Sequence, residues 1–265
     1  MIVVKIGGGE GINYDAILSD VAALDEETVI VHGGNSELTS LSRRLGKEPK
    51  MLHFASGNVS RYTDQETMEL FEMVYCGKIN SLLVEKLHKL GKNAFGLSGL
   101  DGGLLKGERK KELVVLEEGK RKVVRDDRSG NVVDVDSDLL TLLMEKGYLP
   151  VISPPALSED NMAINVDGDR VAALIAAELG ADALIILSNV PGLLKDLKDE
   201  GSLVAELSVS GMERVEHHAQ GRMKIKLLAA KEALSGGVKR VILADARVQK
   251  PVSKALAGGG THIVW

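Results

Sequence analysis

The chain has 265 residues, of which 44% are hydrophobic, 27% charged and only 3% aromatic. This balance is typical of a folded protein with a substantial core rather than of a disordered chain. The net charge of −5 and the scarcity of aromatic side chains disfavour a nucleic-acid-binding protein, which usually presents a basic surface.

The single cysteine, Cys76, excludes internal disulfides and cysteine-based zinc sites. We expect a small buried residue there rather than a nucleophile. The N-terminus lacks the basic and long apolar stretches of a signal peptide. No run approaches the roughly 18 apolar residues that a membrane span needs. Together with a cysteine usage that suits a reducing compartment, these features predict a cytoplasmic protein that does not enter a membrane.

Aliphatic runs recur along the chain, and each ends in glycine or small polar residues. They are MIVVKIGGG, TVIVHGGN, YLPVISPPA, ADALIILSNVPG and KRVILADAR. Helical patterns accompany them, as in YDAILSDVAAL, SELTSLSRRLG and DRVAALIAAELG. Strands that are aliphatic on both faces are expected where helices cover both sides of a sheet. We therefore predict an α/β fold, a three-layer αβα sandwich with a mostly parallel central sheet, whose ligands lie beyond the carboxyl ends of the strands.

The first strand contains an unusual lysine, Lys5, shortly before Gly7, Gly8 and Gly9. A buried ammonium group is costly unless it is paired. The glycines match neither the P-loop nor the dinucleotide-binding pattern. The second strand ends in a similar turn, HGGN at 32–35, where glycines would let the backbone approach an anion at the start of the next helix. Most Gly-Gly pairs are only turns, so both interpretations stay open.

One segment, residues 104–135, breaks the alternation of strands and helices. It predicts a β-ribbon in which VVL and KVV are joined by the turn EEGK. Residues 106–128 carry a charge of +3, while the rest of the chain carries −8. A solvated hairpin of mixed charge and a docking surface for an acidic partner are both compatible with this composition.

A third region places Asn165, Asp167 and Asp169 just ahead of an alanine-rich helix. Either aspartate could simply cap that helix. A carboxylate here could also lie beside lysine or metal-phosphate charge. Calcium binding is disfavoured, because the EF-hand spacing and its terminal glutamate are absent.

The last distinctive helix is GRMKIKLLAAKEAL at 221–234. Lys224 and Lys226 flank its apolar stripe at similar angular distances, so periodicity cannot choose between them. The six histidines are scattered without the spacing of metal ligands, and we assign none of them a catalytic role.

Taken together, seven collinear segments resemble motifs of the amino-acid kinase superfamily, whose members phosphorylate carboxylates, carbamate or nucleoside monophosphates with ATP. Each motif is weak alone. They are VKIGGG (4–9), VHGGN (31–35), GLSGLDGG (96–103), INVDGDRVAA (164–173), LSNVPGLL (187–194), GRMKIKLLAA (221–230) and GGGTHIV (258–264). The chain is most similar to acetylglutamate kinases and their sister group, which phosphorylates α-aminoadipate or glutamate carried by the protein LysW. SGNVSRYTDQETMELFEMVYCGKIN, SNVPGLL and AQGRMK resemble the sister group more closely.

The resemblance implies a role for each matching position. Lys5 and Lys226 would neutralise the transferring phosphoryl group, and Asp169 would hold the two lysines in place. Gly7, Gly8, Gly33 and Gly34 would supply backbone N–H groups to the phosphates and the acceptor carboxylate, with Gly7 and Gly8 on the phosphate side. The predicted acceptor-binding residues are Gly33, Gly34, Arg61 and Asn165, with Arg61 suited to a bidentate pair with a carboxylate. The predicted adenosine side consists of Ser188, Asn189, Val190, Gly192, Leu193, Gly221 and Met223.

The resemblance also implies a donor and partners. ATP would be the donor, with Mg²⁺ held mainly through its phosphates and no metal site on the protein. A lobe of about residues 1–160 would bind the acceptor, and a lobe of about 161–265 would bind ATP. LysW is acidic, which now favours docking as the role of the ribbon. The predicted docking residues are Arg109, Lys110, Lys111, Arg121 and Lys122. We further expect a homodimer that acts in lysine and possibly arginine biosynthesis.

Two departures from the family pattern matter. Ser188 and Asn189 stand where many members have Thr-Asp, which leaves the nucleotide contacts there open. The chain starts at its first strand, so we expect no feedback inhibition of the kind that depends on an extra N-terminal helix. Two alternatives remain, a kinase of free N-acetylglutamate and a non-catalytic sensor on the same fold. One methylene separates aminoadipate from glutamate, too little for the sequence to choose between them.

Overall fold

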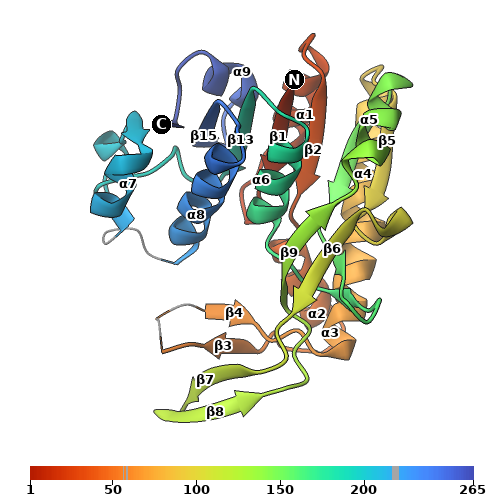
Figure 1. The fold of residues 1–265 in the computed structure, drawn as a ribbon, viewed down its shortest axis with the longest axis vertical. Coiled ribbons are helices and arrows are strands. Elements are labelled where there is room, and N and C mark those ends of the chain that lie inside the picture. Colours follow the sequence, from red (N-terminus) through yellow and green to blue (C-terminus); the bar gives the residue numbers. More distant parts are fainter. Residues whose placement is uncertain (56, 58, 217–220) are drawn as a thin grey trace.

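The computed structural model describes residues 1–55, 57, 59–216 and 221–265 (Figure 1). Its centre is an eight-stranded sheet in which every pairing is parallel except that of β16 with β15. The strands, in spatial order, are β14 (Glu206–Ser208), β16 (Thr261–Val264), β15 (Arg240–Asp245), β13 (Ala183–Ser188), β1 (Ile2–Ile6), β2 (Thr28–His32), β10 (Leu149–Ser153) and β5 (Ala94–Ser98). The prediction of a mostly parallel sheet is confirmed.

Helices cover both faces of this sheet, so the predicted three-layer architecture is confirmed as well. One face packs against α5 (Ser137–Glu145), α6 (Gly168–Glu178), α7 (Val209–Glu216) and α8 (Arg222–Ser235). The other packs against α1 (Tyr14–Ala22), α2 (Asn35–Arg44), α3 (Gln65–Glu72), α4 (Asn80–Lys89) and α9 (Pro251–Leu256). Each face has its own buried apolar cluster, because aliphatic side chains alternate between the two sides of each strand.

The alternation in β1 determines where its lysine points. Ile2, Val4 and Ile6 belong to the cluster under α1 and α4, whereas Val3 belongs to the cluster under α6 and α8. Lys5 is two residues after Val3 and therefore faces α6 and α8 as well. A lysine in a buried strand thus reaches the carboxyl end of the sheet on the side where α6 begins.

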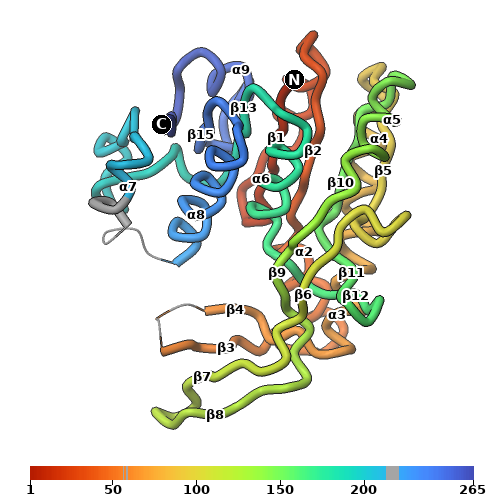
Figure 2. The backbone as a smooth tube through the Cα atoms, viewed as in Figure 1, coloured from red at the N-terminus to blue at the C-terminus, as the bar shows by residue number. Residues whose placement is uncertain are grey.

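Two hairpins project together from one end of the molecule, and we call them, with the segment 110–112 that leads into the second hairpin, the arm (Figure 2). They are β3 (Met51–His53) with β4 (Val59–Arg61), and β7 (Leu113–Glu117) with β8 (Lys120–Val124). Glu118 and Gly119, both at positive φ, form the two-residue turn between β7 and β8, which confirms the predicted EEGK hairpin. Leu52, Leu113 and Val115 form a small apolar cluster between the hairpins.

A second sheet connects the arm to the main body. Its strands are β12 (Ala163–Ile164), β11 (Ala156–Leu157), β6 (Leu105–Arg109) and β9 (Gly130–Val135). The three-residue helices η2 (Asp101–Gly103) and η3 (Glu200–Ser202) lie in loops, and a π-helix, η1 (Met73–Ile79), joins α3 to α4. None of the helices in the described part of the chain is long and apolar enough to cross a membrane. The lobe boundary near residue 160 stays a prediction, since β1 and β2 share one sheet with β13.

Candidate active site

Three charged side chains meet beyond the end of β1, and we call Lys5, Asp169 and Lys226 the triad. Lys5 Nζ lies 2.6 Å from Asp169 Oδ1, and Lys226 Nζ lies 2.8 Å from Asp169 Oδ2. All three residues are less than a tenth exposed. The structure therefore brings together the three residues that were predicted to be catalytic, although their catalytic role stays a prediction.

The geometry of the triad also distinguishes Asp167 from Asp169 and Lys224 from Lys226, which the sequence alone could not do. Asp167 caps α6, its Oδ1 accepting hydrogen bonds from the N–H groups of Asp169 (2.9 Å) and Arg170 (3.1 Å). Asp169, in the first turn, is instead the partner of both lysines. On α8, Lys226 points inward and is buried, whereas Lys224 is exposed. On α6, Asp167 thus caps the helix, and Asp169 is the counter-ion of the two lysines.

Electrostatics leave the triad short of negative charge. Burial alone would raise the pKa of Asp169, but the ammonium groups of Lys226 and Lys5 hold it well below its ordinary value. Burial lowers the pKa of Lys226, and the Asp169 carboxylate opposes that effect. Burial and the neighbouring Asp169 carboxylate raise the pKa of Asp167. One firmly ionised carboxylate therefore faces two ammonium groups, an arrangement that favours further negative charge nearby.

The glycine loops after β1 and β2 are packed against each other beside the triad. A Cβ on Gly8 would overlap the backbone N of Gly34, and a Cβ on Gly33 would lie 2.7 Å from the backbone N of Gly8. The Ser36 N–H donates to the Gly8 carbonyl at 2.8 Å. Close approach of the two backbones explains why both loops need glycine. It also places the predicted phosphate loop and the predicted acceptor loop side by side.

Two of the four predicted ligand-binding glycines use their N–H groups in hydrogen bonds within the protein. The Gly7 N–H donates to the Leu187 carbonyl at 2.9 Å, and the Gly33 N–H donates to the Ile6 carbonyl at 2.8 Å. The expectation that all four glycines offer N–H groups to ligands is therefore wrong for Gly7 and Gly33. The N–H groups of Gly8 and Gly34 have no backbone acceptor among the described residues. Their binding role stays a prediction.

The predicted acceptor residues lie close to this loop pair. Arg61 Nη2 donates to Asn35 Oδ1 at 2.9 Å and to Thr39 Oγ1 at 2.6 Å, at the start of α2. Its Nε is buried and finds no partner in the part of the chain that the structure describes. Asn165 Nδ2 donates to Thr63 Oγ1 at 3.1 Å, so Asn165 is tied to the strand end that carries Arg61. These contacts hold both side chains in place and leave Arg61 with an unused donor.

The predicted adenosine side begins where β13 ends. Ser188 is buried, and its carbonyl accepts the Ala246 N–H at 2.7 Å. Asn189 is exposed, and its amide group faces Gly9. Val190 is half-buried.

Further along that loop, Gly192 packs against Thr261, whose hydroxyl would lie 2.6 Å from a Cβ at this glycine. Leu193 has its side chain in the core, its N–H donates to Thr261 Oγ1 at 2.9 Å, and its carbonyl accepts the Val204 N–H at 2.9 Å, so both backbone groups are used within the protein. Gly221 precedes α8, and Met223 is half-buried against the core. Residues 217–220, including part of the AQGRMK motif and two histidines, lie outside the described residues.

A buried histidine next to the acceptor loop is a residue to which we assigned no role. His32 Nδ1 lies 3.3 Å from the Gly33 carbonyl oxygen, and Asn80 Nδ2 lies 3.1 Å from His32 Nε2. Burial lowers the pKa of His32 to about 4, so the ring is neutral. The amide nitrogen of Asn80 can only donate, so His32 Nε2 accepts this hydrogen bond. The proton of the ring is then on Nδ1, which donates to the Gly33 carbonyl. Only its place directly before the glycine pair could have marked His32 in the sequence.

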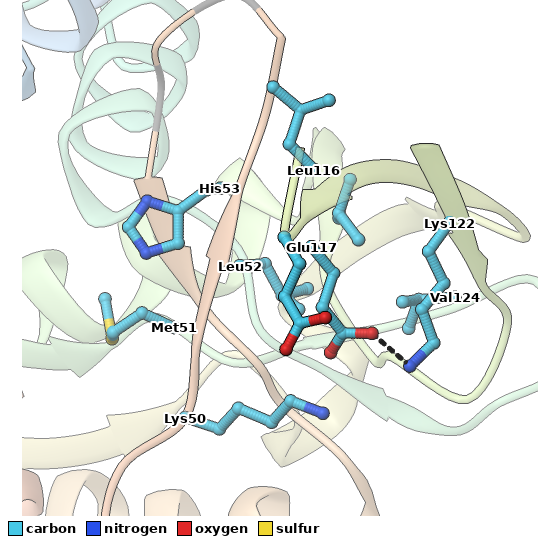
Figure 3. Close-up of a pocket in the computed structure, with 10 residues that line it drawn as sticks. Lys50, Met51, Leu52, His53, Leu116, Glu117, Lys122 and Val124 are labelled. Atoms are coloured by element: carbon cyan, nitrogen blue, oxygen red, sulfur yellow. Dashed lines mark hydrogen bonds and ion pairs between the residues drawn. The ribbon is translucent and has the colours of Figure 1, made fainter. Parts of the chain in front are cut away.

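Two hollows are lined by described residues. One of about 600 Å³ opens beside the glycine loops and is lined by Gly9, Glu10, Asn35, Ser36, Thr39, Ser40, Arg43 and Arg44. The other, of about 210 Å³, lies in the arm between β3 and the β7–β8 hairpin, with the Lys122–Glu117 ion pair (2.6 Å) at its wall (Figure 3). Within the described ranges, no group of three or more His, Cys, Asp or Glu side chains could hold a metal ion.

The predicted docking residues differ in whether their charged groups already have partners within the protein. Arg109 is occupied, because its Nε donates to the Asp127 carbonyl at 2.9 Å and its Nη2 to the Arg125 carbonyl at 2.8 Å. Lys122 is paired with Glu117. The others are exposed and form no ion pair with another described residue; they are Lys110, Lys111 and Arg121.

The fold and the site together define a class of phosphotransferase, and comparison of the sequence with known families leads to the same class. The chain matches the amino acid kinase family over residues 1–245 and belongs to that family. The solved N-acetylglutamate synthase of Neisseria gonorrhoeae, complexed with coenzyme A and N-acetyl-glutamate, shares the fold. Its TM-score is 0.80 at 22% identity, covering 100% of this chain and 59% of that one.

Two relatives narrow the comparison within the family. The [LysW]-aminoadipate kinase of Thermus thermophilus is 54% identical over 268 residues, covering 99% of this chain and 100% of that protein. The [LysW]-aminoadipate/[LysW]-glutamate kinase of Saccharolobus islandicus is 38% identical over 267 residues, covering 100% of this chain and 99% of that protein. Both similarities extend along essentially the whole chain.

Proposed function

We propose that this protein transfers the γ-phosphoryl group of ATP to the side-chain carboxylate of α-aminoadipate carried by LysW, giving an acyl phosphate and ADP. The observation that carries the proposal is the buried triad at the carboxyl end of the sheet. The relative at 54% identity is named for aminoadipate alone, and the one at 38% is named for both amino acids. We therefore place aminoadipate first and glutamate second.

The triad suits phosphoryl transfer because the reaction needs positioning and charge stabilisation more than covalent chemistry. The transition state spreads negative charge over the equatorial oxygens of the transferring group. Lys5 and Lys226 would stabilise that charge from fixed positions, since Asp169 holds both ammonium groups and costs no reorganisation during the reaction. A carboxylate nucleophile is already ionised, so no general base is required.

The two glycine loops would align the reactants. Because they touch, the Gly8 N–H would bind phosphate next to the Gly34 N–H, which would bind the acceptor carboxylate. Arg61 and Asn165 would hold the amino-acid part of the acceptor, in a lobe of about residues 1–160. The segments Ser188–Leu193 and Gly221–Met223 would line the adenosine in the other lobe.

Magnesium would come with the nucleotide. Both carboxylate oxygens of Asp169 face ammonium groups, so the triad offers a metal no ready ligand. We propose that ATP phosphate oxygens hold Mg²⁺, which would neutralise part of their charge. The protein's own contribution is then the two lysines and the loop N–H groups.

The arm is the proposed dock for the carrier. Lys110, Lys111 and Arg121 present exposed positive charge on a chain that is acidic overall, which suits the acidic carrier that the resemblance implies. Arg109 is left out of this surface, because its guanidinium is bound to backbone carbonyls. Lys122 would contribute less, since Glu117 offsets its charge. We also propose a cytoplasmic homodimer, and light scattering of the purified protein tests the dimer.

A substrate assay decides between the proposal and its competitors. Purified protein with Mg-ATP is offered LysW-aminoadipate, LysW-glutamate, free aminoadipate and free N-acetylglutamate, and the acyl phosphate is trapped as a hydroxamate. We expect turnover of the LysW-linked acceptors and at most traces with the free ones. Robust turnover of free N-acetylglutamate alone would replace the carrier proposal with the small-substrate kinase. No acyl phosphate with any acceptor would favour the sensor.

A further inference from the structure

The π-helix η1 lies directly behind the acceptor loop. It spans Met73–Ile79, between α3 and α4, and π-helical turns are rare and often occur at functional sites. Two of its side chains cover Gly34. A Cβ on Gly34 would lie 2.5 Å from Ile79 Cδ1 and 3.0 Å from Tyr75 Cε2. The π-helix therefore forms the wall against which the acceptor loop rests.

Tyr75 is firmly held in that wall. It is 7% exposed, and its ring stacks on Phe71 with the ring centroids 3.8 Å apart and the planes 13° apart. The ring of His32, whose Nδ1 contacts the Gly33 carbonyl, lies nearby with the ring centroids 6.4 Å apart. Because the ring is buried and stacked on Phe71, the position of the hydroxyl group is fixed by the packing of the core.

The Tyr75 hydroxyl group lies where acceptor-binding groups converge. The ring edge next to this hydroxyl lies against Gly34, because Cε2 would be 3.0 Å from a Cβ there, and the guanidinium groups of Arg222 and Arg61 act to lower the pKa of Tyr75. Burial raises the pKa of Tyr75 to about 12, so the phenol keeps its proton at neutral pH. A protonated phenol can donate this O–H to an acceptor, and the Gly34 N–H remains available beside it, because it has no backbone acceptor among the described residues.

We infer that Tyr75 is an acceptor-binding residue whose hydroxyl donates a hydrogen bond to the side-chain carboxylate that receives the phosphoryl group. This inference rests on the proposed function. Gly34 lies against Gly8 of the phosphate loop, so a carboxylate at Gly34 is the reacting one rather than the α-carboxylate. One carboxylate oxygen is held by Tyr75 and the Gly34 N–H. The other oxygen is then directed at the phosphorus, which is the orientation that transfer requires.

The variant Tyr75→Phe tests this, because it removes one hydroxyl and keeps the ring stacked on Phe71. We expect the KM for LysW-aminoadipate to rise about tenfold and kcat to fall a few-fold, which is the size of one hydrogen bond to a charged group. The KM for ATP and the melting temperature should stay unchanged. Tyr148→Phe is the matched control, since that tyrosine packs edge-on against Phe95 and is partly exposed.

A second measurement separates binding of the carboxylate from support of the loop. LysW carrying norleucine has a methyl group where aminoadipate has its carboxylate. Equilibrium binding of both carriers to wild type and Tyr75→Phe forms a double-mutant cycle. We expect the variant to weaken LysW-aminoadipate about tenfold and LysW-norleucine hardly at all.

Three results would overturn the inference. They are unchanged acceptor kinetics in Tyr75→Phe, equal weakening of both carriers, and a parallel rise in both KM values with a lower melting temperature. A failure of the proposed function appears elsewhere, in the wild-type substrate profile. If wild type accepted only free N-acetylglutamate, the ratio of wild type to Tyr75→Phe for that acceptor would test Tyr75 in the same way.

Discussion

The triad and the arm both contain lysines, but the lysine charges are buried and paired in the triad and exposed in the arm. In the triad, Lys5 and Lys226 are buried and share one carboxylate, so their positions are set by the sheet and by two helices. In the arm, Lys110 and Lys111 are exposed on the segment that leads into β7 and have no described ion-pair partner. Preorganised charge stabilises a transition state, whereas exposed charge mainly steers and selects partners. Substitutions in the two regions should therefore change different kinetic parameters.

The largest expected effect comes from Lys226→Ala. Removing one of two fixed cations from the phosphoryl site should lower kcat about 10³-fold with the KM of either substrate changed much less. Steady-state formation of acyl phosphate measures this. Lys224→Ala is the matched control, because Lys224 lies two residues away on the same helix and is exposed. A kcat within tenfold of wild type for Lys226→Ala would contradict the triad mechanism.

The next effect is on stability. Asp169→Asn keeps the shape of the side chain and leaves two buried ammonium groups without a charge partner. We expect the free energy of unfolding to fall by about 3–5 kcal/mol, measured by urea denaturation at pH 7.5. Asp167→Asn provides the comparison, since asparagine is also a good helix cap and should cost less than about 1 kcal/mol. Similar losses in the two variants would contradict the role of Asp169 as the counter-ion of both lysines.

The next prediction concerns the pH dependence of stability that comes from His32, a buried polar side chain that is neutral in the folded protein. Its pKa is about 4 in the folded protein and about 6.5 when unfolded, so the unfolded chain binds the proton first as the pH falls. Stability from His32 is therefore complete above pH 6.5 and is lost between pH 6.5 and 4. Between pH 7.5 and 5.0 the loss should be about 2 kcal/mol. His32→Gln should remove this part of the pH dependence, and an identical pH profile in both proteins would contradict it.

The smallest effect is expected in the arm. Reversing the charges of Lys110, Lys111 and Arg121 to glutamate should raise the KM for LysW-aminoadipate about tenfold at low salt and leave kcat unchanged. The difference should shrink in 0.5 M NaCl, where the Debye length is only a few ångströms. A KM that does not depend on these charges would reject the arm as the dock.

The control for the arm is a second triple reversal of the same charge change. Lys89, Lys146 and Lys254 are exposed at the ends of helices α4, α5 and α9, on the main body rather than the arm. If this variant raised the carrier KM as much, the effect would be one of net charge and not of a docking surface.

The main sheet was largely predictable, because five of its strands are near-continuous aliphatic runs. The strands missed were shorter or more polar, such as Ala94–Ser98 and Thr261–Val264, whose place depends on pairing with neighbours. Within the site, residue types were readable but their choice was not. Periodicity could not separate Lys224 from Lys226, because the decision depends on where α8 crosses α6 and Asp169.

Two features had no usable signal in the sequence. The π-helix Met73–Ile79 continues from a normal helix, and only its packing behind Gly34 reveals it. The use of the Gly7 and Gly33 N–H groups inside the sheet depends on hydrogen bonds to strands that are distant in the sequence. Arg109 was counted among the docking cations for its charge alone, and its backbone partners remove it from that surface.

The buried triad also means that catalysis and binding can be separated by design. Replacing a buried ionic group as a whole by apolar residues of similar volume is often neutral or stabilising, whereas removing one member is not. Methionine at positions 5 and 226 with leucine at 169 would leave the glycine loops, Arg61 and the arm in place. Such a protein would hold nucleotide and loaded carrier together without consuming either. It would serve as a trap in which the ternary complex can be crystallised.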